Sequence, residues 1–121
     1  MIIQKIVYRD REIALIEGCD PIADGQSALD LMAAVRYETG CNRMALPKEA
    51  FSEDFFRLST GLLGEILQKY QNYGMKLAVY GDYSGYTSKP LRDFIYESNE
   101  GRDFFFLSTQ KEALERLAQA K

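Results

Sequence analysis

The sequence predicts one α/β domain, residues 1–121, in which four helices flank a mixed, mostly parallel five-stranded sheet. Two observations lead to this fold class. Segments with strand character alternate with amphipathic segments of helix length, as in chains that join parallel strands through helices. Two of the strand-like runs, residues 75–80 and 104–107, are largely apolar, which is typical of strands covered on both faces. A length of 121 residues fits one hydrophobic core.

The first two elements are predicted to be an antiparallel hairpin. Residues 2–8 and 12–16 are short runs rich in apolar and β-branched side chains. The charged residues 9–11 separate them and provide the turn. The first strand is then expected at an edge of the sheet.

A helix and a third strand follow the hairpin. Asp24 or Ser27 can cap the helix, and Ser27 with Asp30 has the spacing of a capping box. Apolar residues recur on one helical face until Gly40, where the helix is expected to end. Residues 43–46 have the character of a short strand.

The middle of the chain contains an irregular segment and the second helix. Residues 48–58 mix carboxylates with phenylalanines, and we expect an ordered loop or a turn of helix held by those aromatic rings. Ser59 or Thr60 is expected to cap the helix that follows. Gly74 ends this helix, and the strand of residues 75–80 comes next.

The last third of the chain adds a helix, a strand and a final helix. Ser88 is predicted to cap the first of these helices, with Pro90 in its first turn. Residues 104–107 form the fifth strand, and Thr109 with Glu112 caps the last helix. The predicted order is therefore β-β-α-β-α-β-α-β-α, with right-handed crossovers between the parallel strands.

Composition argues against several classes of function. The chain has no histidine, so it lacks the usual Ser-His and Cys-His nucleophile pairs and any imidazole metal ligand. The net charge is −3 and the basic residues are scattered, which argues against a nucleic-acid-binding surface. No apolar run has the length of a membrane helix, and the N-terminus lacks a signal-peptide pattern. The two cysteines are isolated in the sequence, so we expect a reduced cytoplasmic protein. From the composition as a whole, we expect no cofactor, no metal and no contact with nucleic acid or membrane.

The segment Ser59-Thr60-Gly61-Leu62, together with the order of the elements, resembles the STAS domain. This is the SpoIIAA-like fold of anti-sigma-factor antagonists, and sulphate-transporter tails share it. In the antagonists, the serine that matches Ser59 is the phosphorylation switch. The resemblance implies a regulatory, protein-binding role with phosphorylation at Ser59. Leu58 replaces the aspartate that usually precedes that serine.

Over nearly its whole length the chain resembles domain-of-unknown-function family 4180, a family of small bacterial proteins. The segments that carry this resemblance are residues 26–32, 53–56, 58–67, 87–89 and 91–95. The resemblance implies membership of a family, and it implies no activity.

The site is expected at the edge of the sheet where the parallel strands end, because ligands of open α/β sheets bind there. The candidates for contact with a partner or an anion are Ser59, Thr60, Gly61, Glu53, Asp82 and Tyr83. The helix start near Ser59 offers free N–H groups and the positive end of a helix dipole. The same side chains also have structural interpretations, as a helix cap, solvated carboxylates and a packed tyrosine.

Two functions remain open from the sequence. The first is a non-enzymatic, STAS-like regulatory or protein-interaction module that acts through Ser59. The alternative is a small-ligand-binding protein or a carboxylate-dependent enzyme that uses Glu53, Asp82 and Tyr83; no catalytic residue is assigned. A homodimer that pairs through the strand of residues 2–8, or through a tyrosine-rich surface, is a further hypothesis.

Overall fold

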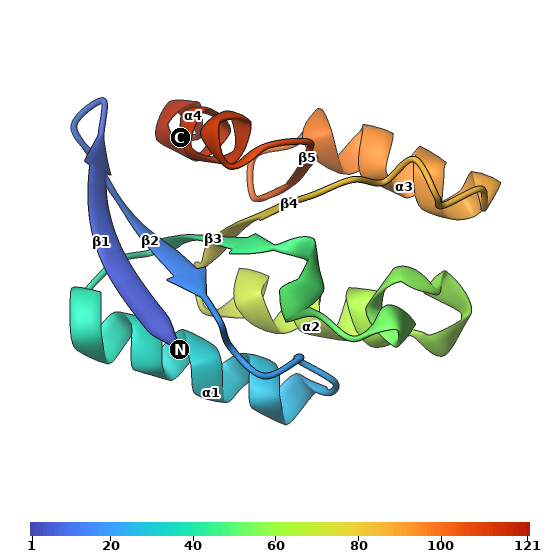
Figure 1. Ribbon diagram of the computed structural model, residues 1–121, viewed down its shortest axis with the longest axis horizontal. Helices are drawn as coiled ribbons and strands as arrows, with labels where there is room; N and C mark the ends of the chain where they lie inside the picture. Colours follow the sequence, from blue (N-terminus) through green and yellow to red (C-terminus); the bar gives the residue numbers. More distant parts are fainter.

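The structure is a computed structural model that describes residues 1–121, and it has the predicted α/β architecture (Figure 1). The five strands are β1 (Ile2–Tyr8), β2 (Arg11–Glu17), β3 (Arg43–Pro47), β4 (Lys76–Tyr80) and β5 (Phe104–Leu107). The four α-helices are α1 (Gly25–Thr39), α2 (Leu62–Asn72), α3 (Lys89–Asn99) and α4 (Gln110–Gln119). None of these helices is both long and apolar enough to cross a membrane.

The strands lie in the sheet in the same order as in the sequence, β1-β2-β3-β4-β5. β1 pairs antiparallel with β2, and the other neighbours are parallel, as predicted. Because each parallel strand lies next to its predecessor, right-handed crossovers place the connecting helices on one face of the sheet. In Figure 1, α1 and α2 lie on that face and α4 lies on the opposite face. The carboxyl ends of β2 to β5 therefore share one edge.

The predicted antiparallel hairpin is confirmed, except that Arg11, expected in the turn, is the first residue of β2. Its turn consists of Arg9 and Asp10, whose φ angles are +52° and +65°. Two central residues with positive φ are the signature of a type I′ turn, which suits a two-residue loop between twisted strands. The register continues without interruption from the pair Tyr8–Arg11 to the pair Ile2–Glu17.

The helix caps were largely predictable. Asp24 caps α1, because its Oδ1 accepts a hydrogen bond of 2.7 Å from the backbone N–H of Ser27. The predicted capping box of Ser27 with Asp30 is wrong, since Ser27 is the third helical residue and completes the box that Asp24 begins. Ser88 and Thr109 cap α3 and α4, as predicted.

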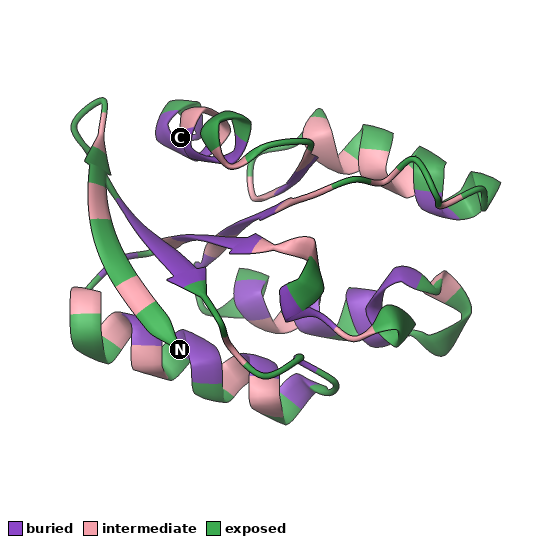
Figure 2. Cartoon of the chain, viewed as in Figure 1, coloured by how far each residue is buried: buried purple, intermediate pink, exposed green.

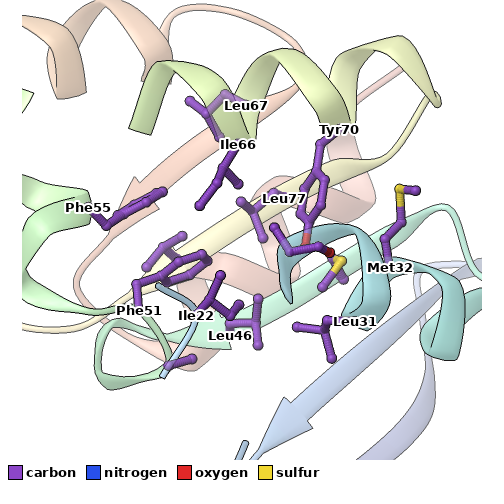
Figure 3. Close-up of a cluster of buried hydrophobic side chains, with 14 of the residues drawn as sticks. Ile22, Leu31, Met32, Leu46, Phe51, Phe55, Ile66, Leu67, Tyr70 and Leu77 are labelled. Atoms are coloured by element: carbon purple, nitrogen blue, oxygen red, sulfur yellow. The ribbon is translucent and has the colours of Figure 1, made fainter. Parts of the chain in front are cut away.

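Two apolar clusters hold the layers together. One cluster fills the space between the sheet and the helices α1, α2 and α3, and Figure 3 shows ten of its labelled side chains. The other lies between the sheet and α4. β5 serves both, because Phe105 belongs to the cluster under α4 and Phe106 to the opposite one. This confirms that the strand of residues 104–107 is covered on both faces.

Candidate functional site

A surface hollow lies where the segment between β3 and α2 meets the loop between β4 and α3. Its volume is about 740 Å³. Phe56, Leu58 and Leu91 contribute apolar atoms to its lining, and Glu53 and Ser59 contribute polar atoms. The two segments that form it follow β3 and β4 directly, so the hollow lies at the carboxyl edge of the sheet, where the sequence places the site.

The first wall of the hollow is the segment between β3 and α2. It consists of three 3₁₀ turns, Lys48–Ala50, Glu53–Phe56 and Leu58–Thr60. Phe55 is fully buried beneath them, and its ring stacks on that of Phe51 with centroids 4.2 Å apart. The prediction of an ordered segment held by its phenylalanines is therefore confirmed.

The start of α2 differs from the prediction. The helix begins at Leu62, and its N-cap residue is Gly61, which has a left-handed φ of +77°. The predicted cap by the hydroxyl of Ser59 or Thr60 is wrong, because both residues belong to the preceding 3₁₀ turn. A residue with a Cβ rarely adopts such a φ, so glycine suits this change of direction.

The hydroxyls of Ser59 and Thr60 have different surroundings. Thr60 Oγ1 lies 2.8 and 2.9 Å from the backbone carbonyls of Asp54 and Arg57 and shares its one proton between them. It also accepts a hydrogen bond of 3.2 Å from the N–H of Leu62 and so stabilises the junction with α2. Ser59 is exposed, lines the hollow, and its hydroxyl makes no hydrogen bond within the chain.

The second wall is the loop after β4, which contains two of the predicted site residues. Hydrogen bonds from the side chain and backbone of Ser84 hold the pKa of Asp82 below its usual range. Tyr83 Oη donates to the carbonyl of Val79 at 2.7 Å. Burial raises the pKa of Tyr83 above the usual value for a phenol. Asp82 and Tyr83 therefore shape the loop, and neither lines the hollow.

The burial of Tyr83 leads to a testable pH dependence. Above pH 10 an unfolded chain loses the phenolic proton, whereas folded Tyr83 keeps it. The stability that this group contributes is therefore complete below pH 10 and is lost as the pH rises. In urea unfolding at several pH values between 9 and 11.5, we expect Tyr83→Phe to lose stability less steeply than the wild type. The slopes of the free energy of unfolding against pH should differ between the two proteins by up to about 1.4 kcal/mol per pH unit. Equal slopes for wild type and Tyr83→Phe would contradict this expectation.

Sequence reasoning missed one polar contact at the mouth of the hollow. Lys48 Nζ donates to Tyr86 Oη at 3.2 Å, and Tyr86 Oη donates to Glu53 Oε2 at 3.3 Å. The ammonium of Lys48 also lies 4.6 Å from the centroid of the Tyr86 ring. The hydrogen bond with Tyr86 raises the pKa of Lys48. The sequence did contain a sign of this contact, because Lys48 directly follows β3 and therefore lies at the edge where the parallel strands end.

Gly81 keeps Lys48 in this position. A Cβ at residue 81 would lie 2.7 Å from the Cβ of Lys48, closer than such atoms approach. We therefore expect Gly81→Ala to lower the free energy of unfolding by about 1–3 kcal/mol and to displace Lys48 from Tyr86. Urea unfolding measures the first effect, and the chemical shift of the Lys48 side chain reports the second. Gly85→Ala is the matched control, because a Cβ there meets nothing within 4 Å.

The hollow brings together only some of the predicted side chains. No group of three or more cysteine, aspartate or glutamate side chains converges as metal ligands do. Of the predicted candidates, the structure brings Glu53 and Ser59 into the same hollow; Thr60, Gly61, Asp82 and Tyr83 lie outside its lining. What remains is an apolar floor with a rim of hydroxyls, one carboxylate and the guanidinium of Arg57.

The comparisons with known proteins give a family. The profile of the domain of unknown function DUF4180 matches residues 8–117, which includes every element except most of β1 and the end of α4. Nothing matched among curated proteins or among solved structures. The match spans far more than half of the chain and agrees with the resemblance seen in its sequence. The chain therefore belongs to the DUF4180 family.

Proposed function

We propose that this protein is a non-enzymatic regulatory module that binds a protein partner through the hollow beside Ser59. The partner contacts the apolar floor at Phe56 and Leu58 and the rim at Ser59 and Tyr86. The protein acts in the bacterial cytoplasm. Two observations support this location: the family it resembles consists of small bacterial proteins, and both of its cysteines are free thiols, as in a reducing compartment.

One observation carries this proposal: Ser59 is the candidate group that the chain leaves free. Its hydroxyl is exposed on the rim and has no hydrogen-bond partner within the protein. Asp82 is engaged with Ser84, and the hydroxyl of Tyr83 is engaged with the backbone of β4. A free hydroxyl beside an apolar floor is suited to contact with another molecule or to modification.

The lining of the hollow also has the composition of a protein interface. Interface centres are enriched in aromatic residues and surrounded by polar groups. Here the ring of Tyr86 lies 5.1 Å from that of Phe56, between centroids, and Glu53 and Arg57 lie at the rim. The resemblance to STAS domains supports a regulatory role for such an interface, with phosphorylation of Ser59 as its switch.

Affinity capture from the source cells tests this function. Wild-type protein and three variants, Ser59→Asp, Ser59→Ala and Ser108→Asp, serve as baits, with proteins identified by mass spectrometry. Ser108 is an exposed serine outside the hollow and controls for the added charge. We expect a partner that Ser59→Asp loses and that Ser59→Ala and Ser108→Asp retain. Identical partner sets for all four baits would contradict the proposal.

The contact of Lys48, Tyr86 and Glu53 favours a second candidate function. A lysine and a carboxylate that share one phenol can bind a polar small molecule or transfer a proton. This is the ligand-binding or carboxylate-dependent alternative expected for Glu53, Asp82 and Tyr83, now with Lys48 and Tyr86 in place of Asp82 and Tyr83. A ligand at 100 times its Kd would stabilise the protein by about 2.7 kcal/mol in a thermal-shift screen. Glu53→Gln and Tyr86→Phe should remove that shift if the site is here.

A further inference from the structure

The outer edge of β1 is open and apolar. Every residue of β1 is exposed or half-buried, and Figure 2 shows this strand without a buried position beside the buried centre of β2. The exposed aliphatic side chains of the protein are Met1 (66% exposed), Ile2 (61%) and Val7 (65%). All three lie on or next to this strand, and the other large exposed apolar side chains are tyrosines. Soluble proteins normally protect such an edge.

The opposite edge of the sheet is protected. β5 is the last strand, and the end of α3 covers its free backbone groups. The side-chain amide of Asn99 accepts from the N–H of Phe106 at 2.7 Å and donates to the carbonyl of Phe106 at 3.0 Å. Ser98 Oγ donates to the carbonyl of Phe104 at 2.7 Å. The protein thus blocks one edge with side chains and leaves the other unblocked.

The hairpin register shows which backbone groups of β1 face outward. Residues next to a two-residue type I′ turn form a hydrogen-bonded pair, here Tyr8 with Arg11. Hydrogen-bonded and non-hydrogen-bonded pairs alternate along antiparallel strands. The N–H and C=O groups of Ile3, Lys5 and Val7 therefore point away from β2 and have no strand beside them.

We propose that β1 pairs antiparallel with β1 of a second copy, with the two-fold axis at Gln4, so that the two sheets become continuous. In this register, Ile3 of each copy exchanges two backbone hydrogen bonds with Lys5 of the other. The exposed Ile2 lies opposite Ile6 of the second copy, on the face that carries α4. Val7 lies opposite Met1. The exposed aliphatic side chains all gain an apolar neighbour in this way.

The charges of β1 permit a second copy and disfavour the register centred on Lys5. The only charged side chain of β1 is Lys5, and its ammonium lies 3.4 Å from Glu12 of β2. An edge lysine normally repels a second strand, but here its charge is already compensated. A two-fold axis at Lys5 would instead place two lysines directly opposite each other, which destabilises a strand pair. Pairing about Gln4 avoids this, so the strand is complementary to itself.

The association state of the whole chain tests the first part of the proposal. Sedimentation velocity from about 1 µM to 1 mM should show the mass of the wild type rising from 13.8 kDa towards twice that value. Lys5→Pro removes an outward N–H without touching a bond to β2, and edge strands tolerate proline. We expect Lys5→Pro to remain at the monomer mass, and Lys5→Thr, which keeps the N–H, to dimerise. Circular dichroism must show that both variants are folded.

Cross-linking tests the register independently. Gln4→Cys in a Cys19→Ser background brings two thiols together across the axis. Gln4 faces Gln4 in a non-hydrogen-bonded pair, and the Cα atoms of such a pair lie about 4.5 Å apart, within the range of a disulfide. We expect a disulfide-linked dimer from Gln4→Cys and none from Lys5→Cys or Val7→Cys. A wild type that stays monomeric at 1 mM overturns the proposal, and so does a dimer that Lys5→Pro leaves intact. A dimer that cross-links through Lys5→Cys alone overturns the register.

Discussion

Replacing Phe55 with alanine is expected to lower the free energy of unfolding by about 3–5 kcal/mol. The side chain is fully buried, and its ring contacts those of Phe51 and Phe56, with centroids 4.2 and 5.0 Å away. The backbone around it consists of short 3₁₀ turns, which have few internal hydrogen bonds to keep their shape. The loss therefore includes both the buried ring and the support of the segment. Urea unfolding followed by circular dichroism measures it.

Two variants separate these contributions. Phe55→Leu keeps most of the buried volume and should cost clearly less than the alanine variant. Arg57→Ala changes an exposed residue of the same segment and should stay within about 0.5 kcal/mol of the wild type. A loss below 1 kcal/mol for Phe55→Ala would mean that the segment holds its shape without this ring. Other contacts would then have to hold the segment that forms the first wall of the hollow.

The elements of this fold could be predicted because their signals are local. A helix cap depends on residues within one turn, and Ser88 and Thr109 were recognised from such spacing. The hairpin depends on two short runs and the residues between them. The alternation of strands and helices then limits the order and handedness of the sheet. These steps require no knowledge of contacts between distant residues.

The prediction for the start of α2 failed because two local signals compete there. Ser59 and Thr60 are good capping residues, and Gly61 is a good residue for a left-handed backbone. In the structure the glycine ends a 3₁₀ turn and begins the helix at once. The hydroxyl of Thr60 then binds backbone groups on both sides of it. Sequence spacing alone cannot rank these alternatives, since both satisfy the first turn of a helix.

The lining of the hollow was less predictable than its place in the fold. Lys48 and Tyr86 are 38 residues apart, and they meet only because β3 and β4 are neighbours with parallel register. Asp82 and Tyr83 lie at the expected edge, but their side chains form hydrogen bonds with the backbone of Ser84 and Val79 and so stabilise the loop. The direction of a loop side chain depends on the packing of both walls, and packing is not encoded in a motif.

Replacing Tyr70 with alanine is the other change for which we expect a loss of about 3–5 kcal/mol in the free energy of unfolding. Tyr70 is fully buried in α2, where Figure 3 shows its hydroxyl directed towards α1. Tyr70 Oη donates to the carbonyl of Ala28 at 2.8 Å. One side chain thus joins the two helices that cover the same face of the sheet, through both its ring and its hydroxyl.

Substitutions at this position distinguish the hydroxyl from the ring. Tyr70→Phe removes only the hydrogen bond and should cost about 1 kcal/mol. Tyr73→Ala removes an exposed ring just after the same helix and should have almost no effect. If Tyr70→Phe costs as much as Tyr70→Ala, the hydroxyl rather than the packing of the ring holds α1 against α2. Tyr70 does not line the hollow, so Tyr70→Ala should weaken partner capture only in proportion to the fraction of unfolded protein. Ser59→Asp, in contrast, should abolish capture while the protein remains folded.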